Sequence, residues 1–173
     1  MPAPITIRPA NQKDCGRLAA LLIEAFEYYG DKNRLSAAEL SKRLRAHLGA
    51  QPGYEALIAE CDGDAVGFAI FAPVFWTIDC KIALFLKEIF VTEQARNNGA
   101  GKRLMLALAE LAQARDWTRL VWTVDRINKD ALGFYRKLPG TRALDRYVYM
   151  WPVDAIEYLS QSPDKRSTPT SST

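Results

Sequence analysis

The chain has 173 residues, of which 49% are hydrophobic and 25% are charged, and its formal net charge is +3. This length suits one domain, no apolar run approaches the roughly 20 residues of a membrane-spanning helix, and the small basic excess does not indicate nucleic-acid binding. Three scattered cysteines and a single histidine, His47, argue against a disulfide framework and a multi-histidine metal site. Residues 1–9 lack the features of a signal peptide. We therefore expect a cytoplasmic protein with no metal, nucleic acid or membrane partner.

The first elements predicted in chain order are a strand and a helix. Residues 5–8 are rich in β-branched side chains and precede a proline, which is typical of a short strand. Apolar residues then recur at helical spacing over 18–29. Asp14 is the expected N-cap of this helix, and Gly30 is the expected stop.

A second helix and three strands follow. The helix is predicted over 36–48, where Ser36 and Glu39 have the spacing of a capping box. After this helix the apolar residues take on the spacing of strands, and an Asp-Gly pair at 62–63 indicates a hairpin between the first two strands. The three apolar runs predict an antiparallel meander over 54–61, 65–73 and 82–91.

The second half of the chain predicts alternating helices and strands. A polar stretch over 92–100 leads into a long helix that should stop near Asp116. The remaining elements are expected to be a strand, a short helix and a last strand, over 120–124, 128–138 and 146–151. This order predicts a single α/β (α+β) domain with a mixed sheet. We assign the domain to residues 1–153 and a C-terminal extension, expected to be mobile, to 154–173.

The segment most informative about chemistry is the loop 96–101, between a buried strand that ends at Val91 and an amphipathic helix. A helix N-terminus presents unpaired N–H groups and partial positive charge, so it can bind an anion. Gly99 and Gly101 would let a phosphate approach the backbone, and Lys102 opposes the helix dipole unless an anion binds there. The spacing matches neither a P-loop nor a dinucleotide fingerprint, and alone it is also compatible with an ordinary flexible loop.

Two motifs in this sequence carry a family resemblance. Arg96-x-x-Gly99-x-Gly101 resembles the acetyl-CoA-binding motif of the GNAT superfamily of N-acetyltransferases, and Asn128 followed by Phe134-Tyr135 resembles a second motif of that family. The order of predicted elements is also similar. Within the family, the chain looks most like the diamine (spermidine/spermine-type) branch. The resemblance implies a GNAT fold, a mostly antiparallel sheet whose fourth and fifth strands splay apart, and a homodimer.

The resemblance also implies acetyl-CoA as co-substrate and a set of residues that bind it. The backbone of 89–91 would flank the pantetheine and acetyl group, the amides of 96–102 would hold the pyrophosphate, and Asn128 would contact the cofactor arm from the other side. Arg103 would add charge or face solvent. The implied cofactor-binding residues are Ile89, Phe90, Val91, Arg96, Asn97, Asn98, Gly99, Ala100, Gly101, Lys102 and Asn128.

Two residues are candidates for acid–base chemistry. Tyr135, as general acid, could protonate the departing thiolate. The sequence alone favours a core aromatic residue at this position, and the family resemblance favours the general acid. Glu88 interrupts an apolar strand and, if buried, could deprotonate an ammonium. Glu88 could instead pair with Lys87, or orient the amine while a water relays the proton. His47 lies on a helix stripe and is a poor candidate for a catalyst.

The implied reaction is acetyl transfer to a primary amine of a small molecule by direct attack. The alternatives are a non-catalytic CoA-binding or regulatory module and acetylation of a protein or peptide amine. Acidic residues that could attract an amine include Glu24, Glu27, Asp31 and Asp79, but the segment 30–34 is mixed in charge. We therefore do not expect a dedicated polyamine site.

Overall fold

The computed structural model describes residues 4–31, 35–51, 53–146, 148–153 and 155–156. Their contacts divide the chain into two units, residues 1–138 and 139–173. The secondary structure and the site described below belong to the first unit. No helix within the described ranges is long and apolar enough to cross a membrane.

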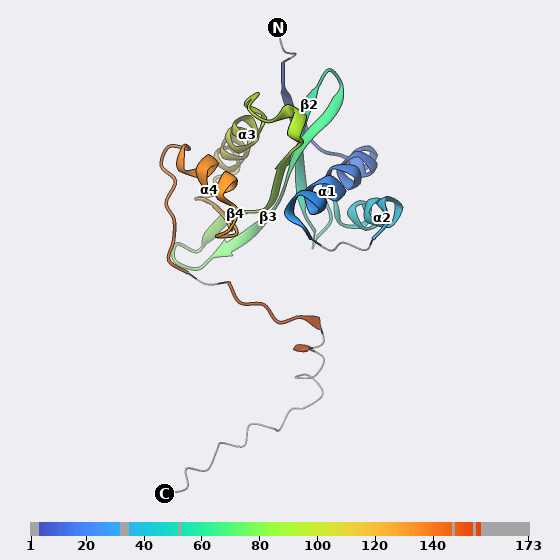
Figure 1. Cartoon of the computed structure of the whole chain (residues 1–173). Coiled ribbons are helices and arrows are strands. Elements are labelled where there is room, and N and C mark those ends of the chain that lie inside the picture. The colour runs from blue at the N-terminus through green and yellow to red at the C-terminus, as the bar shows by residue number, and fades with distance from the viewer. Residues whose placement is uncertain (1–3, 32–34, 52, 147, 154, 157–173) are drawn as a thin grey trace, which may run out of the picture. The chain divides into compact units, whose positions relative to one another are not determined.

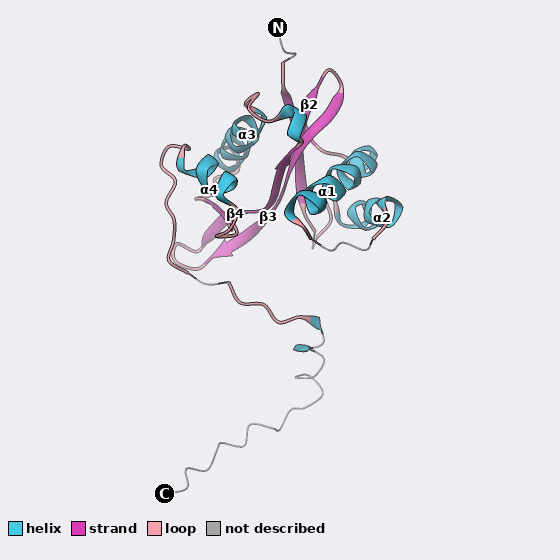
Figure 2. Cartoon of the chain, viewed as in Figure 1, coloured by secondary structure: helices cyan, strands magenta, loops and turns pink. Residues whose placement is uncertain are grey.

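The first unit is a five-stranded sheet with helices on both faces (Figures 1 and 2). The strands follow the order β1-β2-β3-β4-β5, and all neighbours are antiparallel except β4 and β5, which are parallel. The elements are β1 (Thr6–Pro9), η1 (Gln12–Asp14), α1 (Cys15–Tyr29), α2 (Ala37–His47), β2 (Glu55–Cys61), β3 (Asp64–Trp76), β4 (Lys81–Val91), η2 (Glu93–Ala95), α3 (Ala100–Ala114), β5 (Leu120–Trp122) and α4 (Lys129–Arg136). This mixed sheet confirms the predicted fold class.

The sheet separates two apolar cores because successive residues of a strand face opposite sides. In β2, Leu57 and Ala59 pack in the core that contains α3 and Tyr135 of α4. Ala56 and Ile58 point the other way, into the core formed with α1. Figure 1 shows α3 and α4 on one side of the sheet and α1 and α2 on the other.

At one point of the ladder between β3 and β4, the strand β4 has one extra residue that β3 does not match. Glu88 pairs with Ile70, but Leu86 pairs with the residue directly after Ile70, so Lys87 has no partner and forms a β-bulge. Leu86 packs on the α3 side of the sheet, whereas Phe90 packs on the α1 side. Regular alternation would have put Leu86, Glu88 and Phe90 on one face. The bulge therefore moves Glu88 to the face covered by α1.

The parallel ladder between β4 and β5 is short. It runs from the pair Leu84–Leu120 to the pair Leu86–Trp122, and β4 then continues alone to Val91. The two strands thus separate where the resemblance places a splay. Beyond Trp122, one edge of β4 faces no strand in the described part of the chain.

The predicted end of α1, the hairpin turn and the cap of α2 are all confirmed. Gly30 ends α1 in the left-handed conformation at φ 73°, and the hairpin between β2 and β3 turns through Asp62 and Gly63 at φ 53° and 86°. The Ser36 hydroxyl accepts a hydrogen bond from the main-chain N–H of Glu39, which caps α2. These ends are set by neighbouring residues, so the sequence predicts them well.

The prediction of a strand over 146–151 is wrong for the residues that the structure describes. Residues 146 and 148–151 are not in a strand, and Tyr147 lies outside the described residues. Val148 and Trp151 are 77% and 69% exposed. Alternating aromatic residues define a side-chain pattern, but a strand also needs a neighbour for its main-chain hydrogen bonds. The predicted extension 154–173 lies almost wholly outside the described residues and stays a prediction.

The strands β3 and β4 come unusually close at Gly67. A Cβ atom added there would lie 2.7 Å from the carbonyl oxygen of Phe90 and 3.2 Å from Cγ2 of Val91. Only a residue without a side chain allows this spacing without a shift of the backbone.

A buried carboxylate ties β1, η1 and β2 together. Asp14 stands at the N-cap position of α1, as predicted, but its side chain makes no cap hydrogen bond. Instead both of its oxygens accept from Arg8 at 2.8 Å, and one accepts from the N–H of Asn11 at 2.9 Å. Arg8 also donates to Glu60, which Arg17 binds at 2.7 Å. The hydrogen bonds from Arg8 lower the pKa of Asp14 to about 2.

This network predicts an acid limit of stability. The folded pKa of Asp14 is lower than that of an unfolded aspartate, so its contribution is complete above pH 4 to 5 and is lost as the pH falls toward 2. The free energy of unfolding should fall by about 2 kcal/mol over this range through Asp14 alone. Urea unfolding at several pH values measures it. Asp14→Asn should be less stable at pH 7 and have a flatter slope; an unchanged slope would contradict the assignment.

Candidate active site

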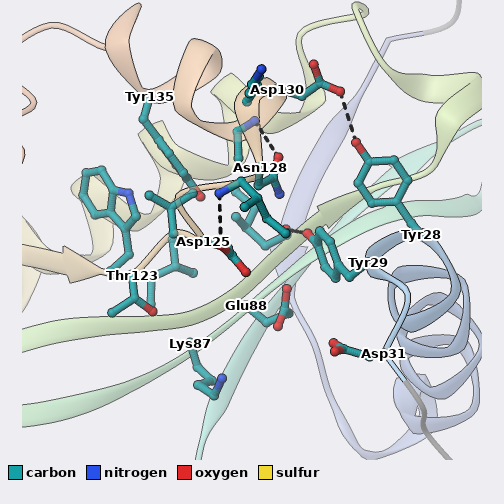
Figure 3. Close-up of a pocket in the computed structure, with 17 residues that line it drawn as sticks. Tyr28, Tyr29, Asp31, Lys87, Glu88, Thr123, Asp125, Asn128, Asp130 and Tyr135 are labelled. Atoms are coloured by element: carbon teal, nitrogen blue, oxygen red, sulfur yellow. Dashed lines mark hydrogen bonds between the residues drawn. The ribbon is translucent and has the colours of Figure 1, made fainter. Parts of the chain in front are cut away.

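A cavity of about 590 Å³ opens where β4 and β5 separate (Figure 3). One wall is the end of α1, another is β4 around Glu88, and the third is the segment from the end of β5 into α4. The lining residues are Tyr28, Tyr29, Asp31, Leu86, Lys87, Glu88, Ile89, Trp122, Thr123, Val124, Asp125, Ile127, Asn128, Lys129, Asp130, Ala131 and Tyr135. Both predicted acid–base residues are therefore in the same cavity, although they are 47 positions apart in the sequence.

Glu88 lies half-buried in the middle of this cavity (Figure 3). Burial raises the pKa of Glu88, and the negative charge of Asp31 raises it further, whereas Lys87 and a hydrogen bond from Tyr29 lower it. The raised pKa makes Glu88 a stronger proton acceptor than an exposed glutamate. Glu88 is in no salt bridge among the described residues, so the structure does not favour the predicted alternative of a pair with Lys87.

Tyr135 comes from α4 and points into the cavity from the opposite side (Figure 3). Its ring packs against those of Trp122 and Phe134, each at a centroid distance of 5.2 Å. The side chain is 9% exposed, and its hydroxyl meets no hydrogen-bond partner within the described ranges. Burial, with the charge of Glu88, raises the pKa of Tyr135 to about 12, so the hydroxyl keeps its proton at neutral pH.

The cavity has an acidic lining, of which the sequence analysis singled out Glu88 and Asp31 but neither Asp125 nor Asp130. Its four carboxylates are opposed by two lysines, and none of the four forms a salt bridge in the part of the chain that is described. The carboxylates are Asp31, Glu88, Asp125 and Asp130, and the lysines are Lys87 and Lys129. Such a lining favours a positively charged ligand.

Tyr28 and Tyr29 at the end of α1 are further lining residues that were not predicted. The Tyr29 hydroxyl donates to the carbonyl oxygen of Ile89 at 3.3 Å, and the Tyr28 hydroxyl donates to Asp130 at 3.3 Å. The helical periodicity had included only Tyr29, as a member of an apolar stripe. Contacts 60 and 102 positions apart leave no local signal in a sequence.

The loop predicted to bind pyrophosphate has the conformation that such a role needs. Gly99 caps α3 in the left-handed conformation at φ 82°, and Asn97 is also left-handed at φ 63°. The main-chain N–H groups of residues 97–102 meet no acceptor among the described residues. A Cβ on Gly101 would touch the Phe134 ring at 3.4 Å. Free donors at a helix N-terminus fit a diphosphate, so the loop is compatible with the nucleotide part of coenzyme A.

The basic residues near this loop differ in their contacts. Arg96 donates from Nε to the carbonyl oxygen of Val91 at 3.2 Å and covers the ring of Tyr28. Lys102 and Arg103 are both exposed at the start of α3, and Arg103 also donates to the carbonyl oxygen of Ile5 at 2.7 Å. Arg103 is therefore tied to the chain just before β1 while it remains exposed to solvent.

The other predicted cofactor residues lie along the opening. The carbonyl oxygens of Ile89 and Val91 are on the edge of β4 that β5 has left, where Tyr29 and Arg96 bind them. Phe90 is buried on the α1 side, so its side chain is part of the core. Asn128 lines the cavity, but its Oδ1 caps α4 by accepting from the N–H of Ala131 at 3.0 Å. Only the amide nitrogen of Asn128 can still donate to a ligand.

The described residues contain no group of three or more potential ligands that could hold a metal ion. His47 ends α2 and lines a separate shallow groove with Tyr54 and Leu40. It is not among the residues that line the candidate active site.

Comparison with known proteins connects this geometry to a family. A model of the acetyltransferase (GNAT) family matches residues 18–139. The chain is 30% identical over 135 residues to the uncharacterized N-acetyltransferase YhfO of Bacillus subtilis, covering 77% of this chain and 87% of that protein. It is 28% identical over 143 residues to the thialysine N-epsilon-acetyltransferase of Bos taurus, covering 78% and 82%.

Solved structures show the same fold. An integron cassette protein from the mobile metagenome of V. cholerae matches with a TM-score of 0.81 at 24% identity, over 91% of this chain and 98% of that one. The ribosomal-protein-alanine N-acetyltransferase of Brucella melitensis biovar Abortus 2308 matches with a TM-score of 0.73 at 26% identity, over 86% and 99%. Because the family model spans most of the first unit, this chain belongs to the acetyltransferase (GNAT) family, whose members use acetyl-CoA as co-substrate.

Proposed function

We propose that this protein transfers the acetyl group of acetyl-CoA to a primary amine of a small molecule by direct attack, with Glu88 and Tyr135 as base and acid. The observation that carries the proposal is their convergence in one cavity, where β4 and β5 separate. The acidic lining supports a cationic acceptor. Curated relatives named for acetylation of thialysine, L-ornithine and D-amino acids support an amine of the size of an amino acid.

Glu88 prepares the acceptor for attack. An amine enters the cavity as its ammonium form, attracted by the carboxylates, and it must lose a proton before its nitrogen can attack. Glu88 accepts this proton directly or through a water molecule, and its raised pKa suits the task.

Tyr135 completes the proton balance. The bound thioester supplies the acetyl group, and breaking of the carbon–sulfur bond leaves a thiolate that requires a proton. The Tyr135 hydroxyl carries its proton at neutral pH and has no partner among the described residues to compete for it. Its role is to donate this proton to the departing sulfur.

Backbone groups provide the binding site for the cofactor. The free N–H groups of residues 97–102 would hold the pyrophosphate, with Lys102 adding charge nearby. The open edge of β4 from Ile89 to Val91 would lie along the pantetheine arm, and the side-chain N–H of Asn128 would donate from the other side. We propose a homodimer on the family resemblance, and a cytoplasmic location; light scattering in solution would test the dimer.

A panel of amines tests the function itself. It includes thialysine, L-ornithine, spermidine, a D-amino acid and a peptide with N-terminal alanine, and released coenzyme A is detected by its thiol. We expect acetylation of at least one free amino acid or diamine in preference to the peptide. Coenzyme A binding without turnover of any amine would instead favour a regulatory module.

Removal of the Tyr135 hydroxyl should slow the reaction without loss of cofactor. Tyr135→Phe is expected to lower kcat by about 100-fold or more, because a general acid contributes at least this much. The dissociation constant of coenzyme A, measured by calorimetry, should stay within about twofold. Tyr54→Phe is the matched control, since its hydroxyl binds the Leu44 carbonyl away from this cavity. An unchanged kcat in Tyr135→Phe would remove this residue from the mechanism.

The pH dependence of kcat/KM should report Glu88. The base must be ionised, so the rate falls as the pH drops through the pKa of Glu88, which lies above its ordinary value. Asp31→Asn should move this limb to lower pH because it removes a negative charge, and Lys87→Gln should move it to higher pH. Glu88→Gln should lower kcat/KM and abolish its fall at low pH. If kcat/KM of Glu88→Gln still falls at low pH, another group causes the fall.

The loop assignment is tested by cofactor affinity. Acetyl-CoA should raise the melting temperature of the wild-type protein and ATP with Mg²⁺ should not. Gly99→Val should weaken acetyl-CoA binding by about tenfold or more, because valine strains the left-handed conformation that aims the N–H groups. Gly16→Val on α1 is the control, since Gly16 also faces open space but is not left-handed. Equal affinity in both variants would mean that the cofactor binds elsewhere.

A further inference from the structure

The side chain of Arg96 is committed to contacts within the protein. Its Nε binds the Val91 carbonyl at the end of β4, and its guanidinium lies 4.0 Å from the centroid of the Tyr28 ring and 5.8 Å from that of Phe90. A planar cation over the face of an aromatic ring is attracted to it. Arg96 does not line the cavity itself, but it holds the ring of Tyr28, which does.

Tyr28 in turn joins two helices that lie on opposite faces of the sheet. Its hydroxyl donates to Asp130 of α4 at 3.3 Å, as the dashed line in Figure 3 shows. Both residues line the cavity. The chain of contacts from Arg96 through Tyr28 to Asp130 thus spans the opening between α1 and α4.

We propose that Arg96 is a positioning residue for the amine acceptor, acting through Tyr28 on Asp130, and that it links acceptor binding to the nucleotide-binding loop. This inference rests on the proposed function of the cavity. The main-chain N–H of Arg96 binds Glu93, and the next residue begins the row of free N–H groups. One residue therefore belongs to the start of that loop and supports a wall of the acceptor site.

The proposal differs from a role in binding phosphate alone. A residue that only held the pyrophosphate would change the affinity for coenzyme A and leave the acceptor unaffected. A residue that supports Tyr28 changes the KM of the acceptor, and its effect depends on whether Tyr28 is present.

A double-mutant cycle separates these roles. Arg96→Gln, Tyr28→Leu and the double variant are compared for the KM of the most active amine of the panel, at saturating acetyl-CoA. Each single variant should raise this KM by about threefold or more, and the double variant should not exceed the larger single effect. Arg96→Lys, which keeps a cation over the ring, should recover part of the loss. Arg43→Gln, which breaks an exposed ion pair with Glu39 on α2, is the control.

Two results would overturn the proposal. One is a wild-type acceptor KM in Arg96→Gln, and the other is a double variant whose effect equals the product of the two single effects. Calorimetry with coenzyme A accompanies the cycle, and Tyr28→Leu should bind it as the wild type does. Loss of coenzyme A affinity confined to Arg96→Gln, with no change of acceptor KM, would assign Arg96 to phosphate binding only.

A measurement without turnover keeps this inference separate from the proposed reaction. Tyrosine is labelled with ¹³C in the ring, and the Tyr28 signal is assigned by its loss in Tyr28→Leu. Saturation with coenzyme A should shift this signal in the wild type but not in Arg96→Gln. An equal shift in both, or none in the wild type, refutes the link. Absence of any acetylation, with the shift present, refutes the proposed function alone.

Discussion

The early end of the ladder between β4 and β5 is the constraint on which the site depends. Beyond Leu86 and Trp122 the strands separate, and the edge of β4 from Glu88 to Val91 keeps main-chain groups that no strand in the described part of the chain satisfies. Buried main-chain groups without partners are costly, so this edge requires other partners. In this structure the side chains of Tyr29 and Arg96 bind two of its carbonyls. The opening thus creates both the cavity and the need for groups that line it.

The bulge at Lys87 adds the second geometric condition. It changes which face the rest of β4 presents, so Glu88 approaches α1 while Leu86 remains in the core under α3. The acidic cavity arises because the end of α1, the bulged strand and the start of α4 meet at this point. A charged residue inside an apolar strand is therefore tolerated where the sheet opens and solvent or ligand can reach it.

Much of the fold could be predicted from the sequence because its signals are local. Gly30, the pair at 62–63 and Ser36 define turns and caps within a few residues, and the elements around them form as expected. Asp14 stands at the predicted N-cap position of α1, but its side chain makes no cap hydrogen bond, because Arg8 and the N–H of Asn11 occupy its carboxylate. The segment 146–151 has the pattern of a strand but no neighbouring strand among the described residues, and a pattern cannot supply one.

The residues of the candidate site that belong to a sequence motif could be predicted. Those whose role depends only on tertiary contacts could not. Glu88, Tyr135 and the loop 96–102 stood out by composition or resemblance, and the structure places Glu88 and Tyr135 in one cavity, which residues 96–102 do not line. Tyr28, Asp125 and Asp130 carry no such mark, since their importance comes from neighbours far along the chain. Arg96 matched a motif, but its contact with Tyr28 could not be read from the motif.

The close approach of strands at Gly67 limits how such an enzyme can diverge. Its neighbours, the Phe90 carbonyl and Val91, belong to the same stretch of β4 that borders the opening. Any side chain there would displace this stretch, so a residue with no chemical role governs the shape of the entrance as strictly as the reactive groups do. Evolution toward bulkier acceptors must therefore proceed through the walls at α1 and α4, leaving the central strand pair as a fixed template.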